Sequence, residues 1–441
     1  MTPKRHSDAP VVYDIEDRPP LSEAIPLGLQ HVLAMLLGNI TPPLLICGAL
    51  ASSATDTALI LQVALFMAGL ATIVQAYPVG PVGGRIPVIM GTSIAFVGAA
   101  IGVGREFGLA TVFGACLAAA AVEIALGFSI VRVRRFFPPL VNGIVVMLIG
   151  LTLIPVGMDY AAGGVGSENY GSVANLGVAA IVFLITLLLN QIGRGFISYA
   201  SMLFGVVAGY GAAYLLGHVS LASVGSAAWI SIPQPLAFGL EFRASAILMM
   251  AFIYVISTME TIGDISGTIA VCDRDPTDDE LKGGLVADGA MSALAALFSA
   301  FPNTSYSQNV GLVNFTGVAS RHVTAIGGVV LILLGLIPKV GALFATIPAS
   351  VIGGGGLIMF AMIFASGVSI LHRSVSFTRR NLIILAVSIG LGLGVELRPV
   401  VLELAPQAIR SFFGSGLITG GLTALVLNII LPDPHDRRQA S

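Results

Sequence analysis

The chain has 441 residues, of which 56% are hydrophobic and only 10% are charged, and its formal net charge is −2. Soluble domains carry about 25% charged residues, so this composition excludes a water-soluble enzyme of this length. Disordered chains have low hydrophobicity, which excludes disorder as well. The remaining class is a polytopic α-helical membrane protein. No block of basic residues is present, which argues against nucleic acid as a partner.

Fourteen stretches are apolar enough for a membrane span, which needs about 20 mostly apolar residues. In the first half they lie at 26–46, 57–78, 86–103, 109–131, 137–157, 173–192 and 196–216. In the second half they lie at 244–271, 284–301, 304–319, 323–345, 348–371, 380–396 and 411–431. We therefore predict an all-α protein with 14 transmembrane segments.

The distribution of Lys and Arg predicts the orientation of these spans. An even number of spans places both termini on one side, and 16 of the 21 Lys and Arg residues then fall on that side. Cytoplasmic loops are enriched in Lys and Arg, so both termini are predicted to be cytoplasmic, in a multi-pass protein of the cell (inner/plasma) membrane. The N-terminus is polar and lacks the pattern of a cleaved signal.

Two spans, the third and the tenth, cannot be complete apolar helices. Pro and β-branched or polar residues open each of them, in Arg85–Phe96 and in Phe301–Leu312. Each is third in its set of seven, and an odd number per set makes the second set enter from the opposite side. We therefore predict two inverted repeats of seven, with the interrupted segments marking a binding site near the bilayer midplane.

Backbone groups in such interrupted segments need partners at membrane depth. We expect the two extended stretches to pair as a small two-stranded sheet. The short helices that follow would direct their free N–H groups at one point, which suits a polar or anionic ligand. The polar residues at these helix starts are Thr92, Ser93, Ser307, Gln308 and Asn309.

Four acidic residues fall well inside predicted spans: Glu123, Glu260, Asp264 and Asp288. Glu260 and Asp264 share one helix face, and two close carboxylates in a low dielectric favour holding one proton, which would serve proton coupling. Two structural alternatives stay open: Asp264 bonding nearby backbone, and Asp288 as a helix-end residue near water. Glu123, in an alanine-rich stretch far from the broken spans, is interpreted as structural.

Other residues that often carry chemistry predict no cofactor and no metal site. Cys47, Cys116 and Cys272 lie in apolar stretches without pairing spacing, so they are interpreted as packing residues. The Gly353–Gly356 run lacks the Lys and spacing of a phosphate loop and favours close helix packing. His31 is the one histidine well inside a span, which suggests a structural or supporting role.

Four motifs together resemble the nucleobase–ascorbate transporter family, also called nucleobase–cation symporter 2. The segment Gln308–Gly317 resembles the family signature Q/E/P-N-x-G-x(4)-T-R/K/G. The pair Gln30-His31 is similar to its QH motif, and Glu260–Asp264 to its E-x-x-G-D/H element. Gly91–Ser93 resembles the element in the third span. The resemblance covers the chain from about Pro19 to Leu431.

The resemblance implies roles for individual residues. Glu260 would receive ring N–H groups of a nucleobase, Gln308 would bond it from the opposite side, and Tyr306 would lie beside it. Ser93 and Ile94 would complete the substrate contacts, although members often have Phe at the position of Ile94, so that only a backbone contact would remain. The residues implied to organise the site are Asn309, His31, Gln30 and Thr92. Those implied or inferred in proton coupling are Glu260, Asp264 and Asp288.

The family fold also implies a division into a core and a gate that move against each other. The core would comprise 23–133 (spans 1–4) and 244–346 (spans 8–11). The gate would comprise 134–217 (spans 5–7) and 347–432 (spans 12–14). Cytoplasmic tails would occupy 1–22 and 433–441. The resemblance further implies a homodimer surrounded by membrane lipid.

Gln308 together with Asp264 resembles the branch that takes xanthine and uric acid, since uracil-type members have Glu at the first position and often His at the second. The leading hypothesis is a proton-coupled secondary active importer of xanthine and/or uric acid. Alternatives are a symporter of uracil, ascorbate or another nucleobase, and an anion channel or exchanger on the same inverted-repeat fold. Glu260 disfavours anions. A membrane enzyme is disfavoured because no nucleophile–base pair or metal-ligand cluster is recognisable.

Overall fold

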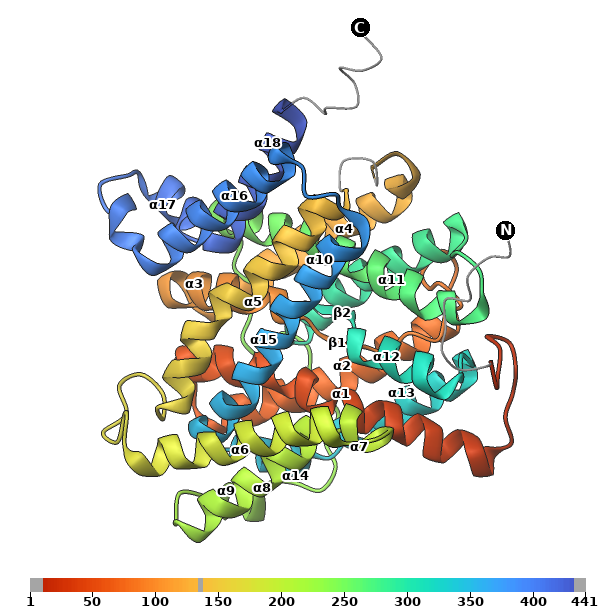
Figure 1. Ribbon diagram of the computed structural model, residues 1–441. Coiled ribbons are helices and arrows are strands. Elements are labelled where there is room, and N and C mark those ends of the chain that lie inside the picture. Colours follow the sequence, from red (N-terminus) through yellow and green to blue (C-terminus); the bar gives the residue numbers. More distant parts are fainter. Residues whose placement is uncertain (1–10, 134–137, 432–441) are drawn as a thin grey trace, which may run out of the picture.

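The computed structural model describes residues 11–133 and 138–431 as a mostly helical bundle around one short sheet (Figure 1). The predicted tail 433–441 lies outside the described residues. So do residues 1–10 of the predicted N-terminal tail, the start of the predicted gate segment at 134–137, and residue 432.

Each of the fourteen predicted spans coincides with helices or with a strand followed by a helix. In the first half these elements are α1 (Leu21–Ala49), α2 (Ala54–Ala76), β1 (Met90–Thr92), η1 (Ile94–Phe96), α3 (Val97–Phe107), α4 (Leu109–Val133), α5 (Pro139–Ala161), α6 (Val173–Ile192), α7 (Phe196–Tyr199) and α8 (Ser201–Leu215). In the second half they are α10 (Ala244–Ile269), α11 (Asp278–Leu297), β2 (Asn303–Ser305), α12 (Ser307–Thr316), α13 (Arg321–Gly335), α14 (Pro338–Ala345), α15 (Ala349–Ser374), α16 (Arg379–Leu397), α17 (Gln407–Phe413) and α18 (Gly416–Ile430). The connections contain α9 (Ala222–Ser226), η3 (Ala270–Cys272) and η4 (Pro399–Leu402).

Two details of the predicted spans were wrong. The span 323–345 is not continuous, because α13 and α14 meet at an angle of 81°. Pro338 is the first residue of α14, and proline has no N–H with which to continue the preceding helix. The ninth span begins at Asp278 and not at 284, because Thr277 and Glu280 form a capping box that starts α11 earlier.

Part of the predicted N-terminal tail is packed against the bundle. The Val12 N–H donates to the Gly317 carbonyl at 2.8 Å, just after α12 ends. Glu16 forms an ion pair with Arg321 at 2.6 Å at the start of α13. The segment therefore supports the junction between α12 and α13.

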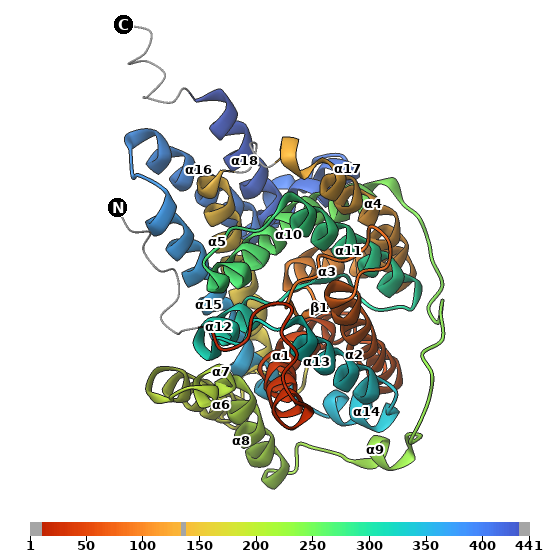
Figure 2. The ribbon, with the colours of Figure 1, turned by 90° about the vertical axis from the view of Figure 1, so that its right-hand side faces the viewer.

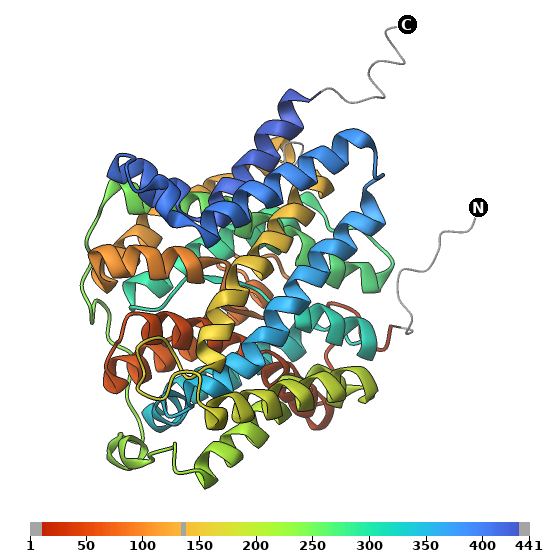
Figure 3. The ribbon, with the colours of Figure 1, turned by 60° about the vertical axis from the view of Figure 1, so that its left-hand side comes forward.

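The long helices pack in two groups. In one, α15 packs along α5 and α6, and α16 packs along α18. In the other, α2 packs against α13 and α14, while α4 packs against α10 and α11. Figure 2 shows the two groups on opposite sides of the molecule, and Figure 3 shows α5 and α15 running side by side. This grouping is compatible with the predicted core and gate, whose boundaries stay a prediction.

Glycine allows α15 to approach α5 and α6 closely. A Cβ on Gly353 would lie 2.0 Å from the backbone nitrogen of Ala161, and one on Gly354 would lie 2.4 Å from the Ala179 carbonyl oxygen. Both contacts are with backbone, which cannot turn away as a side chain can. The prediction that the Gly353–Gly356 run serves close packing is therefore confirmed.

This contact predicts that Gly353→Ala destabilises the protein, because the added methyl forces α15 away from α5. Overpacking of this kind costs about 1–3 kcal/mol. The matched control is Gly390→Ala on α16, where nothing lies within 4 Å of an added Cβ. The control should be neutral or slightly stabilising, since alanine favours the helix by up to about 1 kcal/mol. Melting temperatures of the detergent-purified variants test this, and an unchanged value for Gly353→Ala would contradict it.

Candidate substrate site

The two interrupted segments form an antiparallel pair of strands at the centre of the bundle (Figure 1). Met90 pairs with Ser305, Gly91 with Thr304, and Thr92 with Asn303. One further bond extends the pairing, from the Ser93 N–H to the Pro302 carbonyl at 2.8 Å. The predicted sheet is confirmed, and it satisfies backbone groups that would otherwise be unpaired inside the membrane.

A short helix starts where each strand ends. The η1 turn and α3 follow Ser93, and α12 follows Tyr306. No side chain caps the N-terminus of η1 or of α12. The first N–H groups of both short helices, with their partial positive charge, are therefore available to a ligand. We call this region, where β1 and β2 pair and these two helices begin, the crossing.

Asn39 of α1 and Tyr306, between β2 and α12, hold strand β1 in place. The Thr92 N–H donates to Asn39 Oδ1 at 2.7 Å, and the Tyr306 hydroxyl donates to the Thr92 carbonyl at 2.7 Å. A Cβ on Gly91 would lie 2.6 Å from Met35 Cε and 2.8 Å from Asn39 Oδ1. Asn39 was missed by the sequence analysis. The available signal was an amide in an apolar helix, about two turns after His31.

Asn309 ties α12 to α1. Its Nδ2 donates to the His31 carbonyl at 3.0 Å and lies 3.0 Å from His31 Nδ1. An amide N–H can donate to Nδ1 only if that nitrogen is unprotonated, so the imidazole carries its proton on Nε2. The two predicted organising residues are therefore brought together. Gln30 is not part of these contacts, since it lines a separate pocket with Leu27 and Phe315.

Two further carboxylates connect α10 and α11 to the crossing. Asp264 accepts hydrogen bonds from Ser305 Oγ at 2.7 Å and from Ser307 Oγ at 2.6 Å. The Asp264 carboxylate therefore accepts from side-chain hydroxyls of β2 and α12. These contacts differ from the alternative in which Asp264 bonds nearby backbone. Asp288 is fully buried within α11 and accepts a hydrogen bond from the Thr261 hydroxyl. The alternative of a helix-end position near water is wrong for Asp288, because α11 starts as early as Asp278.

Buried polar atoms without hydrogen-bond partners gather on the elements that meet here. Among the described residues they include Asn39 Nδ2, Thr92 Oγ1, Ser93 Oγ, Glu260 Oε2 and Asn309 Oδ1. A buried polar group left unpaired costs about 1–3 kcal/mol, so their concentration at one place points to a ligand. The set contains both donors and acceptors. Gln308 and Ile94, which are also predicted substrate residues, are half-buried.

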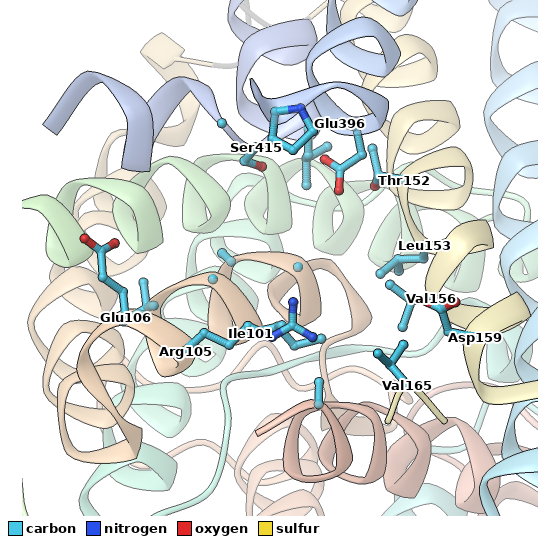
Figure 4. A pocket seen from close by; sticks show the side chains of 18 of the residues that line it. Ile101, Arg105, Glu106, Thr152, Leu153, Val156, Asp159, Val165, Glu396 and Ser415 are labelled. Carbon is cyan, nitrogen blue, oxygen red and sulfur yellow. The ribbon is translucent and has the colours of Figure 1, made fainter. Parts of the chain in front are cut away.

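A cavity of about 940 Å³ lies on one side of this crossing, between the two groups of helices (Figure 4). It reaches Ala95 and Gly98, just beyond Ser93. Figure 4 shows the Arg105 side chain extending into the cavity, with Asp159 and Glu396 on the walls. The lining belongs to helix ends that the Lys and Arg distribution places outside. Neither Glu260 nor Gln308 is part of the lining.

A metal has no obvious site in the part of the chain that the structure describes. Within residues 11–133 and 138–431, no group of three or more His, Cys, Asp and Glu side chains is placed to hold one.

The contact between Asn39 and Thr92 predicts that Asn39→Ala lowers stability, because it leaves the buried Thr92 N–H without an acceptor. The expected cost is about 1–3 kcal/mol. Asn142→Ala is the matched control, since the side-chain oxygen of Asn142 on α5 has no partner to lose. Thermal melting in detergent should separate the two variants. Equal melting temperatures would show that Asn39 does not hold β1.

Comparison with known proteins places this geometry in a family. The sequence profile of the Permease family matches residues 22–401. The chain is 38% identical to the xanthine permease XanP of Escherichia coli, with 96% of this chain and 95% of XanP covered. It is 37% identical to the xanthine permease of Bacillus subtilis, with 92% and 93% covered. It is 38% identical to the uric acid transporter UacT of Escherichia coli, with 91% and 85% covered.

Solved structures share the fold at low sequence identity. The transmembrane domain of the cyanobacterial bicarbonate transporter BicA matches with a TM-score of 0.62 and 14% identity, covering 94% of this chain and all of that domain. The murine anion transporter Slc26a9 in its inward-facing state also matches with a TM-score of 0.62, at 13% identity, covering 91% of this chain and 68% of that one. The fold is thus the inverted-repeat transporter fold, and by sequence the chain belongs to the nucleobase–ascorbate transporter family of permeases.

Proposed function

We propose that this membrane protein is a proton-coupled importer of purine nucleobases, with xanthine and/or uric acid as substrates. The family and its relatives support a nucleobase transporter. The observation that carries the finer proposal is the set of unpartnered buried donors and acceptors at the β1–β2 crossing, with Glu260 Oε2 among them. A purine dione presents alternating N–H and C=O groups, which need such a mixed set.

The residues at the crossing divide the work of recognition. Glu260 accepts hydrogen bonds from ring N–H groups, and the Gln308 amide offers a donor and an acceptor to the opposite edge. The free N–H groups after Ser93 bond a carbonyl of the base, and Tyr306 packs beside it. Helix α10, which carries Glu260, packs against η1, β2 and α12, so it reaches both short helices.

Transport would proceed by movement of the core, which carries the sheet, against the gate. The cavity of about 940 Å³ supports this path, because residues of α3 and α10 line one wall and residues of α5 and α16 line the other. It lies on the predicted outer side, where a substrate for import enters. The proposal includes a homodimer in the lipid bilayer with both termini in the cytoplasm.

The main alternative is an anion channel or exchanger, since the solved structures that share this fold include a bicarbonate transporter and an anion transporter. A carboxylate at the binding site repels a small inorganic anion such as bicarbonate and offers it no hydrogen-bond donor, and Oε2 of Glu260 has no hydrogen-bond partner among the described residues. We therefore favour the nucleobase. Uracil and ascorbate remain distinct outcomes of the experiment.

The decisive experiment is uptake of radiolabelled xanthine by cells that lack their own purine permeases. Unlabelled uric acid, uracil, ascorbate and bicarbonate serve as competitors, with and without a protonophore. Protonophore-sensitive uptake that uric acid blocks and uracil does not would support the proposal. Uptake that ignores the protonophore, or no uptake, would refute proton-coupled xanthine import.

Removing the charge of the central carboxylate should abolish concentrative uptake. Glu260→Gln keeps the size of the side chain but replaces an acceptor with a donor and removes a titratable proton. We expect the rate of xanthine uptake to fall by about a hundredfold, the effect of losing one hydrogen bond to a charged group of roughly 3 kcal/mol, and net accumulation to be lost with the titratable proton. Glu403→Gln, at an exposed position, is the control. Accumulation above the outside concentration by Glu260→Gln would refute this role.

The position of the cavity predicts which residues an external reagent reaches. Gly98→Cys places a thiol in open space on the cavity wall, since nothing lies within 4 Å of its Cβ. A membrane-impermeant thiol reagent added outside should label it and block uptake. Gly263→Cys is the matched control, because its Cβ is equally unobstructed but lies on the predicted inner half of α10. Equal labelling of both from outside would contradict the assigned orientation.

A further inference from the structure

Glu123 is a buried carboxylate that the proposed substrate contacts do not use. It lies within α4, and none of its surface is exposed. Its Oε1 is 3.4 Å from Thr258 Oγ1, and its Oε2 has no hydrogen-bond partner. Thr258 Oγ1 also lies 2.8 Å from the Tyr254 carbonyl, a much better acceptor distance. The single hydroxyl proton of Thr258 is thus used by the backbone, and Glu123 receives no good donor.

This geometry fits a carboxylic acid and not a carboxylate. A buried charge without donors costs several kcal/mol, whereas a protonated Glu123 can donate its own proton to the free lone pair of Thr258 Oγ1. The contrast with Asp264 is direct. Asp264 accepts two hydroxyl hydrogen bonds at 2.6 and 2.7 Å, which suit an ionised group.

A second carboxyl group with an unpartnered oxygen faces the same region. Asp288 Oδ1 has no partner, while its Oδ2 accepts from Thr261, three residues after Thr258 on α10. Helices α4 and α11 are in close contact here, since a Cβ on Gly289 would lie 2.9 Å from the Ile124 nitrogen. Two carboxyl groups in one dry region cannot both easily ionise, so at least one of the two keeps its proton.

The groups near Glu123 come from the two long helices that pack against α4, which are α10 and α11. Asp288 lies on α11 and Glu260 lies on α10, two residues after Thr258. The Tyr254 phenol, also on α10, donates to the Cys116 carbonyl of α4 at 3.1 Å. Hydroxyls continue from Asp288 toward the sheet, because Thr261 Oγ1 lies 3.3 Å from Thr304 Oγ1 on β2.

We propose that Glu123 and Asp288 form a buried proton-binding site at the α4–α10–α11 junction, distinct from the carboxylate Glu260 that binds the base. The proposal rests on the proposed proton-coupled function. A proton from water on the outer side binds a carboxylate of the pair to give the acid. The same proton is released to water on the inner side, which regenerates the carboxylate. The hydroxyls of Thr261 and Thr304 connect the pair to the sheet, and this couples its protonation to the substrate-bound crossing.

The test uses the purified full chain in proteoliposomes with an imposed pH gradient and a trapped pH dye. Radiolabelled xanthine and uric acid are the probes. Glu123→Gln keeps the neutral shape and can still donate to Thr258, but it binds no proton. We expect exchange of substrate across the membrane to stay within about twofold of wild type, because exchange needs no net proton movement. Accumulation should fall by about tenfold per unit of pH gradient for the lost proton, and the dye should report fewer protons per substrate.

Thr258→Val is the second variant, in case Glu123→Gln does not fold. It removes the acceptor of the Glu123 proton and so weakens proton binding. The external pH for half-maximal uptake should then shift to more acidic values by about one unit, a tenfold loss of proton affinity. Glu403→Gln, at an exposed position directly after η4, should behave as wild type in both assays.

The outcomes separate this proposal from the proposed function. Wild-type uptake that is insensitive to the pH gradient would refute the proposed function itself. Gradient-driven wild-type uptake with equal coupling in Glu123→Gln, or with no pH shift in Thr258→Val, would overturn only the proton site. Loss of exchange together with accumulation in folded Glu123→Gln would also overturn it, since the amide preserves the neutral state.

Discussion

The pairing of β1 with β2 is the constraint on which the rest of this structure depends. Two chain segments leave the helical conformation at membrane depth, where water cannot satisfy their N–H and C=O groups. Antiparallel pairing of Met90–Thr92 with Asn303–Ser305 provides each segment with hydrogen-bond partners for its backbone. Because the strands end where η1 and α12 begin, the same pairing sets the position of both free helix N-termini. The location of the candidate site thus follows from the backbone hydrogen bonds between the two strands.

The polar side chains around the sheet divide into those with hydrogen-bond partners and those without. Asn39, Tyr306 and Asp264 form hydrogen bonds with the strands or the helix starts, and these bonds fix the crossing in place. Glu260, Ser93 and Glu123 retain atoms without partners. A low-dielectric interior makes satisfied groups rigid and leaves unsatisfied groups reactive toward a ligand or a proton. Most residues of this polar cluster therefore have either a structural or a proposed chemical role, and Tyr306, which also packs beside the base, has both.

Several features were predictable because they depend on local pattern. Apolar run length set the spans, and the paired interruptions at Arg85–Phe96 and Phe301–Leu312 predicted the sheet and the inverted repeats. The close packing of the Gly353–Gly356 run was also predictable, since small residues in a membrane helix let neighbouring backbones approach closely. The bend before Pro338 was missed, although its signal was present. Glu123 was expected to lie apart from the other acidic residues because it is far from them along the chain, but it lies 3.4 Å from Thr258 of α10, and its structural role stays a prediction.

The class of the protein, the number of its spans and their inverted repetition were predictable from the sequence, as were the residues with unusual polarity for a membrane interior. These follow from hydrophobic length and charge, which act locally. Which of those polar residues meet depends on the packing of the helices. Asn39 reaches Thr92, His31 reaches Asn309, and Glu123 reaches Thr258 across 135 residues of sequence. Such contacts depend on how the helices are rotated and packed against one another. The spacing of residues within each helix does not specify this arrangement.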